Sequence, residues 1–276
     1  MGILYLVATP IGNLEDISLR ALRVLKEAVL VAAEDTRQTH KLLERYKIQA
    51  RMLSYHEHNK LSRLDEVLQA LALGDVALVS DAGTPGLNDP GYELVRAALD
   101  AGYVVSPVPG PSAPISALVT SGLPTDQFLY LGYLPRRSVE RRQLLQTVVD
   151  LPYTLIFLET PHRLLDALSD LLLVLGDRPI AAARELTKLH EEIVRGTVTS
   201  VQSHFEQQEP RGEFTLVVGG ATKEQPAWEE QQVLEALREG RSAGEVPGIL
   251  VERVGKASGW RKKDVYRKLV DLKREA

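Results

Sequence analysis

Three polar segments with glycine and proline follow apolar runs in the first half of the chain. They are TPIGN (residues 9–13), SDAGTPGLNDPG (residues 80–91) and PGPSA (residues 109–113). Glycine lets a backbone approach a ligand closely, and open parallel sheets bind ligands beyond the carboxyl ends of their strands. Turns between strands and helices also favour glycine and proline without any ligand. Because three such segments occur in succession, we interpret them as loops that line one binding site.

The longest of these loops indicates what kind of ligand the site holds. Residues 80–91 contain Asp81 and Asp89 but no lysine or arginine, and the chain lacks both G-x-G-x-x-G and G-x-x-x-x-G-K-[ST]. Those two motifs bind dinucleotides and phosphates, so a polyphosphate ligand is not expected. A ligand with positive charge, or with ribose hydroxyls that need acceptors, fits the carboxylates better. S-adenosylmethionine is one such ligand, because it carries a sulfonium, an ammonium, a ribose and an adenine but no phosphate.

The elements around these loops predict an α/β domain over residues 1–120. Apolar runs at residues 3–8, 28–33, 76–80 and 103–108 read as strands, and they alternate with helical patterns. The expected helices are 18–26, 61–73 and 92–101, with a further helix opening after PGPSA. Ser62 and Asp65 have the spacing of a capping box for the second of these helices. Short buried strands between helices predict a mostly parallel sheet covered on both faces.

Residues 121–222 predict a second α/β domain, this one with a mixed sheet. Strand-like runs occupy residues 128–132, 153–159, 179–185, 193–201 and 213–220. Only two clear helices intervene, at residues 139–149 and 162–175.

The last part of the chain, residues 223–276, predicts a small helical domain with a basic end. Residues 224–245 contain six acidic and two basic side chains, whereas residues 256–276 contain eight basic and three acidic ones. Trp260 and Tyr266 stand among these cations, where they suit either stacking on bases or a small core of their own.

Composition excludes several classes of function. The 276-residue chain has no cysteine, which excludes disulfides, thiolate zinc sites and cysteine nucleophiles. Its net charge of −4 argues against nonspecific nucleic-acid binding by the protein as a whole, so any such contact must come from local patches. No apolar run approaches the ~20 residues that span a bilayer, and the N-terminus lacks the basic region of a signal peptide. We therefore expect a cytoplasmic protein without membrane contact.

Nine motifs in order resemble one branch of a known superfamily. They are LYLVATPIGNLEDISLRAL, AEDTRQTHKLL, SYHEHN, SDAGTPGLNDPG, PVPGPSA, GYLPRR, FLETPHRL, RELTKLHEE and GEFTLVVGG, and they extend from residue 3 to about residue 220. This set resembles the tetrapyrrole-methylase superfamily, in the branch that methylates the 2′-hydroxyl of a cytidine in small-subunit (16S) ribosomal RNA. The resemblance implies S-adenosylmethionine as methyl donor, two α/β domains with the donor between them, and a homodimer.

The resemblance also implies which residues contact the donor. They lie in the three loops and on strands of the second domain: Pro10, Asp81, Ala82, Gly83, Ser112, Ala113, Leu158, Glu213, Phe214 and Thr215. Asp81 would lie near the amino-acid or ribose portion, and residues 213–215 would approach the adenine through their backbone. Leu158 stands where the branch is expected to have tyrosine, and core packing alone would also explain a leucine there.

The reaction implied is attack of a ribose oxygen on the sulfonium methyl, which a base or an electrostatic aid should help. The candidates are Glu159, Glu185 and Lys188, with Glu34 and Asp35 as further carboxylates. Glu159 is preferred because it ends an apolar strand where the cleft should lie. A carboxylate that caps the following helix is the equal alternative for this residue, and solvent is an alternative proton acceptor.

Two groups of cations and one turn are candidates for contact with the RNA. They are Arg136, Arg137, Arg141 and Arg142 of PRRSVERR, His162 and Arg163 of FLETPHR, and Arg261, Lys262 and Lys263 of the tail. The pair His56 and His58 has a spacing that suits a metal, but no third ligand is evident, so no metal site is expected.

Two other functions remain open from sequence. One is a methyltransferase for a small molecule of the tetrapyrrole type, which has no evident use for the basic patches. The other is a nonenzymatic RNA-binding protein, against which the intact set of cleft loops argues. The expected partner in the leading interpretation is small-subunit ribosomal RNA, either free or in the assembled 30S subunit.

Overall fold

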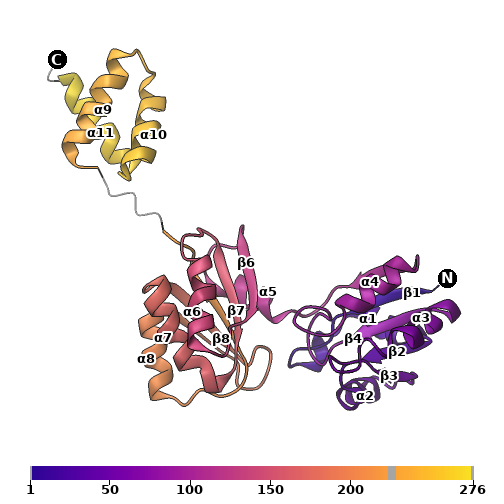
Figure 1. Ribbon diagram of the computed structural model, residues 1–276. Helices are drawn as coiled ribbons and strands as arrows, with labels where there is room; N and C mark the ends of the chain where they lie inside the picture. Colours follow the sequence, from indigo (N-terminus) through magenta and orange to yellow (C-terminus); the bar gives the residue numbers. More distant parts are fainter. Residues whose placement is uncertain (1, 223–227, 275–276) are drawn as a thin grey trace. The chain divides into compact units, whose positions relative to one another are not determined.

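The computed structural model describes residues 2–222 and 228–274, which divide into two compact units, Met1–Ala221 and Thr222–Ala276 (Figure 1). The first unit contains two separate five-stranded sheets with helices. The second unit is helical. The fold class expected from sequence is thus confirmed.

The first sheet is entirely parallel and has the strand order β3-β2-β4-β1-β5. Its strands are β1 (Ile3–Val7), β2 (Leu30–Ala33), β3 (Met52–Ser54), β4 (Val76–Val79) and β5 (Val104–Val108). Its helices are α1 (Leu19–Glu27), α2 (Thr36–Arg45), α3 (Leu64–Leu73) and α4 (Tyr92–Asp100), and a short 3-10 turn spans Leu14–Asp16. Parallel strands leave their carboxyl ends at one edge, which is where the three loops emerge.

Residues alternate between the two faces of this sheet, and each face has its own core. In β2, Leu30 and Ala32 pack with side chains of α3 and α4, whereas Val31 and Ala33 pack with α1 and α2. All four residues of β2 are buried, because helices cover both faces. This confirms the prediction from the short, continuous apolar runs.

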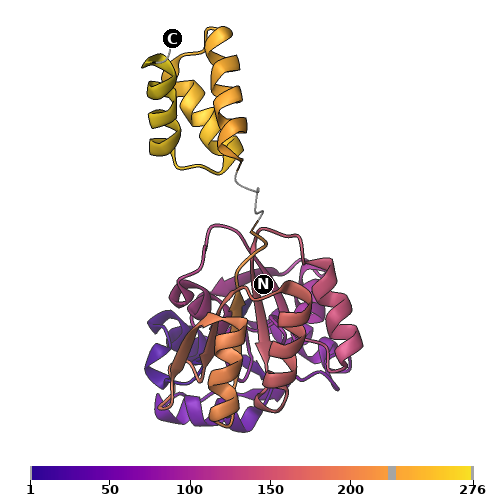
Figure 2. The same cartoon turned by 90° about the vertical axis from the view of Figure 1, so that its left-hand side faces the viewer.

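The second sheet is mixed, with the strand order β6-β7-β10-β8-β9. Its strands are β6 (Phe128–Tyr133), β7 (Thr154–Glu159), β8 (Pro179–Arg184), β9 (Glu192–Thr197) and β10 (Phe214–Val218). Only β6 and β7 pair in parallel, and the other neighbours are antiparallel. Helices α6 (Ser138–Thr147), α7 (Leu164–Leu175) and α8 (Val198–Gln207) cover one face, with α7 and α8 side by side in Figure 2. Helix α5 (Ala113–Ser121) packs on the other face.

Two of the local predictions differ from the structure. Helix α3 begins after Arg63, and the Ser62 hydroxyl donates to the carbonyl of Asn59, so the expected capping box is absent at that helix. The predicted strand over residues 193–201 ends at Thr197, where a capping box of Thr197 and Ser200 starts helix α8. The β-branched residues of this stretch favoured a strand, but the two hydroxyls satisfy the backbone N–H groups of a helix start.

The second unit is a bundle of three helices with a core of its own. They are α9 (Glu230–Ser242), α10 (Pro247–Ser258) and α11 (Lys262–Arg274), and leucine and valine side chains fill the space between them. Trp260 packs against this core, and its indole Nε1 donates to the carbonyl of Trp228 at 2.7 Å. Tyr266, in contrast, is 58% exposed. No helix in the described part of the chain is long and apolar enough to cross a membrane.

Candidate active site

The structure brings the three predicted loops together at the carboxyl edge of the first sheet. Thr9 and Gly83 form an isolated antiparallel bridge, in which each backbone N–H donates to the other residue's carbonyl at 2.9 and 3.0 Å. The Thr9 hydroxyl also donates to the carbonyl of Ser80 at 3.1 Å. Gly83 has a φ of +81°, which glycine adopts without strain. The third loop joins through the Thr84 hydroxyl, which donates to the carbonyl of Pro111 at 3.4 Å.

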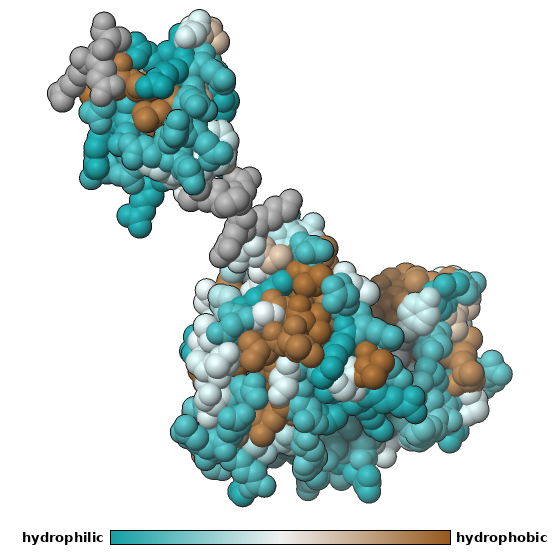
Figure 3. Space-filling view, turned by 60° about the vertical axis from the view of Figure 1, so that its left-hand side comes forward, coloured by the Kyte–Doolittle hydropathy of each residue, from teal (hydrophilic) through white to brown (hydrophobic). Residues whose placement is uncertain are grey.

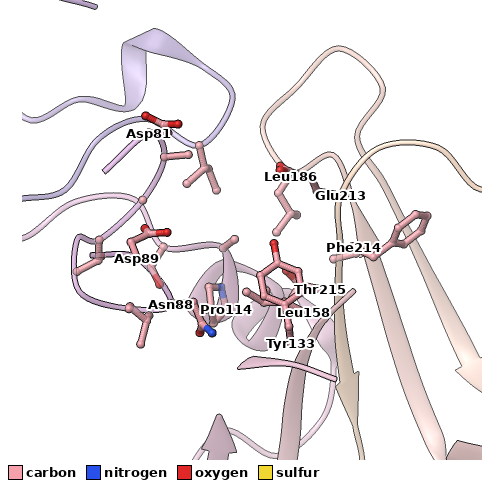
Figure 4. A pocket seen from close by; sticks show the side chains of 18 of the residues that line it. Asp81, Asn88, Asp89, Pro114, Tyr133, Leu158, Leu186, Glu213, Phe214 and Thr215 are labelled. Atoms are coloured by element: carbon pink, nitrogen blue, oxygen red, sulfur yellow. The ribbon is translucent and has the colours of Figure 1, made fainter. Parts of the chain in front are cut away.

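A cavity of about 310 Å³ opens between these loops and the second sheet. The loops form its first wall, to which Ser112 and Ala113 at the start of α5 also contribute. Its second wall comes from β6, β7, β8, β10 and the segment after β8. Figure 4 shows the two walls facing each other, with Asp81 and Asp89 on one and Leu158 and Thr215 on the other. The volume falls in the usual range of small-molecule sites.

The described residues that line the cavity are rich in carboxylates. Five acidic side chains contribute, and they are Glu34, Asp81, Asp89, Glu185 and Glu213. A single basic side chain, Lys188, is found among them. The cavity therefore favours a ligand with positive charge and disfavours a polyphosphate.

Two of these carboxyl groups have raised pKa values. Burial, together with the nearby charge of Glu34, raises the pKa of Asp89 to about 6. Burial also raises the pKa of Glu34, to which the charge of Asp81 adds. Asp81 itself is exposed, and its Oδ1 accepts from the backbone N–H of Asp35 at 2.9 Å. Asp35 caps helix α2 through the backbone N–H of Arg37 and lies outside the lining.

Lys188 is held at the rim by two carboxylates. Its Nζ lies 2.8 Å from Oε1 of Glu185 and 3.1 Å from Oε2 of Glu213. Partial burial acts to lower the pKa of Lys188, but the hydrogen bonds with the two glutamates outweigh it and raise the pKa. The pKa of Glu185 is lowered, because the bonds from Lys188 and from the backbone N–H of Glu213 outweigh the effect of burial. Lys188 is thus a fixed ammonium ion at neutral pH.

The backbone around Lys188 is strained and closely packed. Glu185 and Thr187 have φ values of +49° and +65°, which cost free energy in residues with a side chain. On the facing loop, a Cβ at Gly12 would lie 2.4 Å from Cγ of Lys188, so only glycine lets the two loops approach this closely. Strain of this kind accumulates where a fold positions a side chain for binding or chemistry.

The second wall follows from strand alternation. Leu158, Thr215 and Ala183 lie opposite one another on β7, β10 and β8, and all three line the cavity. Phe214 is next to Thr215, so its side chain points to the opposite face, where it stacks edge-on against Phe205. Figure 4 shows this ring turned away from the other labelled side chains. Phe214 can therefore offer only its backbone to a ligand.

Glu159 does not reach the cavity, and the preference for it as the base is corrected. It lies on the same face of β7 as Phe157, opposite to Leu158, and its side chain is fully buried. Its Oε1 accepts from the backbone N–H of Thr160 and lies 2.5 Å from the guanidinium of Arg163. Neither the 3-10 turn at Pro161–Arg163 nor α7 has a side-chain cap, so Glu159 is not the expected helix cap either. Its bonds to Thr160 and Arg163 instead hold the turn before α7. Glu185 and Lys188, the other two candidates, do line the cavity.

The arginines of PRRSVERR separate into two groups. Arg136, Arg137 and Arg142 are exposed. Arg141 is buried, with its guanidinium 2.6 Å from the buried carboxylate of Asp170, so we remove it from the residues available to RNA. A charge this deeply buried requires its partner. Among the remaining candidates, Arg163 is partly buried, and the others are exposed: His162, Arg261, Lys262 and Lys263.

The lining also includes residues that the sequence did not predict. Ile11, not Pro10, is the residue of the first loop that faces the cavity. Asn88 and Tyr130 line it as well, and the Tyr130 hydroxyl donates to Oδ1 of Asn88 at 2.6 Å. Asn88 has a φ of +64° and lies where a Cβ on Gly132 would clash, which shows how tightly β6 meets this loop. The glycine after the apolar FLYL run was the available signal.

The predicted histidine pair lies outside this cavity. The rings of His56 and His58 lie edge-on, with centroids 6.0 Å apart. Within residues 2–222 and 228–274, no group of three or more histidine, aspartate or glutamate side chains is placed to hold a metal ion.

Comparisons with known proteins agree with this architecture. The family of tetrapyrrole (corrin/porphyrin) methylases matches residues 3–202. A ribosomal RNA small subunit methyltransferase I from Halalkalibacterium halodurans is 46% identical over an aligned region that covers 96% of this chain and 93% of that protein. The protein of that name from Synechocystis is 49% identical, with 86% of each chain covered.

A solved structure shows the same fold at lower identity. It is uroporphyrin-III C-methyl transferase from Thermus thermophilus, complexed with S-adenyl homocysteine. Its TM-score is 0.54 at 23% identity, covering 79% of this chain and 97% of that one. The chain therefore belongs to the tetrapyrrole methylase family and, within it, to the ribosomal RNA small subunit methyltransferase I proteins.

Proposed function

We propose that this protein transfers the methyl group of S-adenosylmethionine to the 2′-hydroxyl of a cytidine in small-subunit ribosomal RNA. The observation that carries the proposal is the cavity between the two sheets, whose described lining has five carboxylates and one ammonium. A sulfonium donor with ribose and adenine groups matches that lining. The names of the relatives at 46–49% identity supply the class of substrate.

The lining suggests how the donor would lie. The apolar wall of Leu158, Ala183 and the Thr215 methyl would contact the adenine, as the resemblance implies for this strand region. The carboxylates of Asp81 and Asp89 would accept from the ammonium or ribose hydroxyls. The N-terminus of α5, where Ser112 makes no side-chain cap, would receive the donor's carboxylate, because helix N-termini carry partial positive charge.

Lys188 would assist the methyl transfer. The attacking 2′-oxygen loses its proton during the reaction, and a fixed ammonium stabilises the negative charge that develops there. Glu185 and Glu213 hold Lys188 in place and keep it charged, so it acts electrostatically and not as the base. Solvent would take the proton.

The second unit supports RNA over a tetrapyrrole as substrate. Arg261, Lys262 and Lys263 are exposed at the start of α11, and Tyr266 is exposed on the same helix. On the face that Figure 3 shows, this unit is mostly hydrophilic. Cations with an exposed aromatic suit phosphates and unpaired bases. We further propose that the protein acts as a homodimer in the cytoplasm, on free ribosomal RNA or on the assembled subunit.

One experiment separates this function from the alternatives. The protein is incubated with labelled donor and, separately, with small subunits from an unmodified strain, the stripped RNA, or tetrapyrrole acceptors. The label is then mapped by nuclease digestion and mass spectrometry. Label on a cytidine ribose is the expected result. Label on a base or a tetrapyrrole, or no transfer at all, would contradict the proposal.

A further inference from the structure

A second cavity of about 280 Å³ lies beside the first, and its character is different. It is lined by Arg184, Glu185, His190, Arg211 and Gly212. Three of the five are basic or imidazole side chains that donate hydrogen bonds, and one is a carboxylate. Glu185 lines both cavities.

The two cavities flank the end of the second sheet. Arg184 ends β8 next to Ala183, which lines the first cavity, so alternation turns the Arg184 side chain to the opposite face. The loop before β10 completes the second cavity. It approaches Glu185 so closely that a Cβ on Gly212, whose φ is +80°, would lie 2.4 Å from the Glu185 side chain. The rim between the cavities therefore carries both Glu185 and its partner Lys188.

Within the described part of the chain, the hydrogen-bond donors of the second cavity are not all paired. Arg184 Nη2 lies 3.2 Å from a carboxylate oxygen of Glu192, but its buried Nε has no hydrogen-bond partner among residues 2–222 and 228–274. Arg211 pairs with Glu209, and both side chains are more than three-quarters exposed. His190 is exposed. An exposed ion pair of this kind contributes little free energy, so Arg211 can exchange its partner at small cost.

We infer that this second cavity is a subsite for a phosphodiester of the RNA strand, next to the nucleotide that is methylated. The inference rests on the proposed function, since it takes the RNA as given and assigns a place to its backbone. Arg184, His190 and Arg211 offer guanidinium and imidazole N–H groups, which are the usual donors to phosphate oxygens. A strand crossing the rim at Lys188 would place a ribose at the first cavity and a flanking phosphate in the second.

The sorting by charge supports this assignment. The first cavity repels phosphate through its carboxylates, so the backbone of the RNA must be bound outside it.

The test uses the full chain and the variants Arg211→Ala and His190→Ala, singly and combined. Arg23→Ala is the matched control. Arg23 is also an exposed arginine that pairs with an exposed glutamate, and it lies on α1, which packs on the first sheet. Binding of labelled small-subunit RNA is measured by fluorescence anisotropy from low to high salt in the presence of S-adenosylhomocysteine. Donor affinity is measured separately by calorimetry.

We expect each variant of the subsite to bind RNA about tenfold more weakly, with the combined variant weaker still. The slope of log affinity against log salt should fall by roughly 0.7 to 1 for each phosphate that the variant no longer binds. Donor affinity and the RNA affinity of Arg23→Ala should match the wild type. RNA affinity and salt slope that are unchanged in the combined variant would overturn the subsite, as would an equal loss in Arg23→Ala.

Methylation by the wild type is a separate measurement. If the wild type binds RNA through these residues but transfers no methyl group to it, the proposed function fails while the phosphate subsite stands. If the wild type methylates RNA and the variants do so with unchanged KM, the function stands and the subsite fails. The two ideas are therefore separable by the same set of proteins.

Discussion

Two neighbouring cavities at the end of the second sheet have opposite chemistry. The first is lined by five carboxylates and one ammonium among its described residues, and the second by two arginines, a histidine and one carboxylate. One side chain, Glu185, belongs to both. The difference shows how a protein with a net charge of −4 can hold a cationic donor and a polyanionic substrate within one small region.

The segment after β8, which separates the two cavities, has residues with positive φ. Glu185 and Thr187 both have positive φ, and Gly212 and Gly12 let the flanking loops close on this segment. Lys188 projects from the same segment and is anchored by two glutamates. We interpret the segment as the divider that brings a ribose oxygen to the donor while keeping phosphates away from the carboxylates.

The largest effect is expected from removing the cation at the divider. Lys188→Ala should lower kcat by about a hundredfold, since it removes the ammonium group that stabilises the negative charge developing on the 2′-oxygen. Donor affinity, measured by calorimetry, should change little. Lys26→Ala, at an exposed lysine on α1, is the control. Unchanged kcat, or a loss that appears entirely in donor affinity, would show that Lys188 has no part in the transfer step.

A smaller effect is expected from the acidic side of the comparison. Asp81→Ala should weaken donor binding about tenfold, through loss of a charged acceptor. Asp81→Asn distinguishes the charge of Asp81 from its role in holding the loop. The amide oxygen of asparagine can still accept from the backbone N–H of Asp35, but the negative charge is lost. If Asn restores donor affinity, Asp81 only braces the loop. Asp100→Ala, at an exposed acid ending α4, should leave donor affinity unchanged.

The second unit should affect only the RNA side. A chain ending at Ala221 keeps both sheets and their cores, because the three C-terminal helices have a separate core. We expect its donor affinity to equal that of the full chain and its KM for RNA to rise about tenfold, through loss of the exposed cations of α11. Steady-state kinetics with small subunits measures this. An unchanged KM would mean that those cations do not contact the substrate.

The sequence predicted the elements and the loops of the site better than the direction of its side chains. Apolar runs and helical spacing are local signals, and they placed every strand of the two sheets except β3, together with the three loops that meet at Thr9, Gly83 and Pro111. Helices α2 and α8 were not predicted. Glu159 ends a strand at the expected edge, yet it faces away from the cavity. One residue earlier or later in a strand reverses the side chain, and the sequence does not fix which face meets the donor.

The sequence also did not predict which charged side chains are buried in ion pairs. Arg141 and Arg142 are adjacent in sequence and both pair with Asp170 at 2.6 Å, but Arg141 is buried and Arg142 is half exposed. Asp170 lies on α7, so the pairing depends on how α6 packs against α7, which local patterns do not reveal. The cavity around Arg184 was missed for the same reason, since it joins residues from β8 and from the loop before β10.

The smallest effect we predict concerns pH and the carboxyl group of Asp89. Its pKa is raised from an ordinary 3.8 to about 6, because burial and the charge of Glu34 disfavour the ionised form. A cationic donor favours that ionised form, so donor binding and protonation of Asp89 oppose each other. Donor affinity should therefore fall severalfold as the pH is lowered from 7.5 through 6 to 5.

Asp89→Asn should bind the donor more weakly at pH 7.5 and lose most of this pH dependence. The same raised pKa makes the ionised Asp89 a cost to the folded state, which grows as pH rises from about 4 to 6. The variant should therefore melt at a higher temperature than the wild type at pH 7.5, even though it binds the donor less well. Calorimetric donor affinities and thermal melts of the variant and the wild type at pH 7.5 and pH 5 test this. A variant with the same pH dependence of donor affinity as the wild type would assign that dependence to another group, with Glu34 as the first to examine.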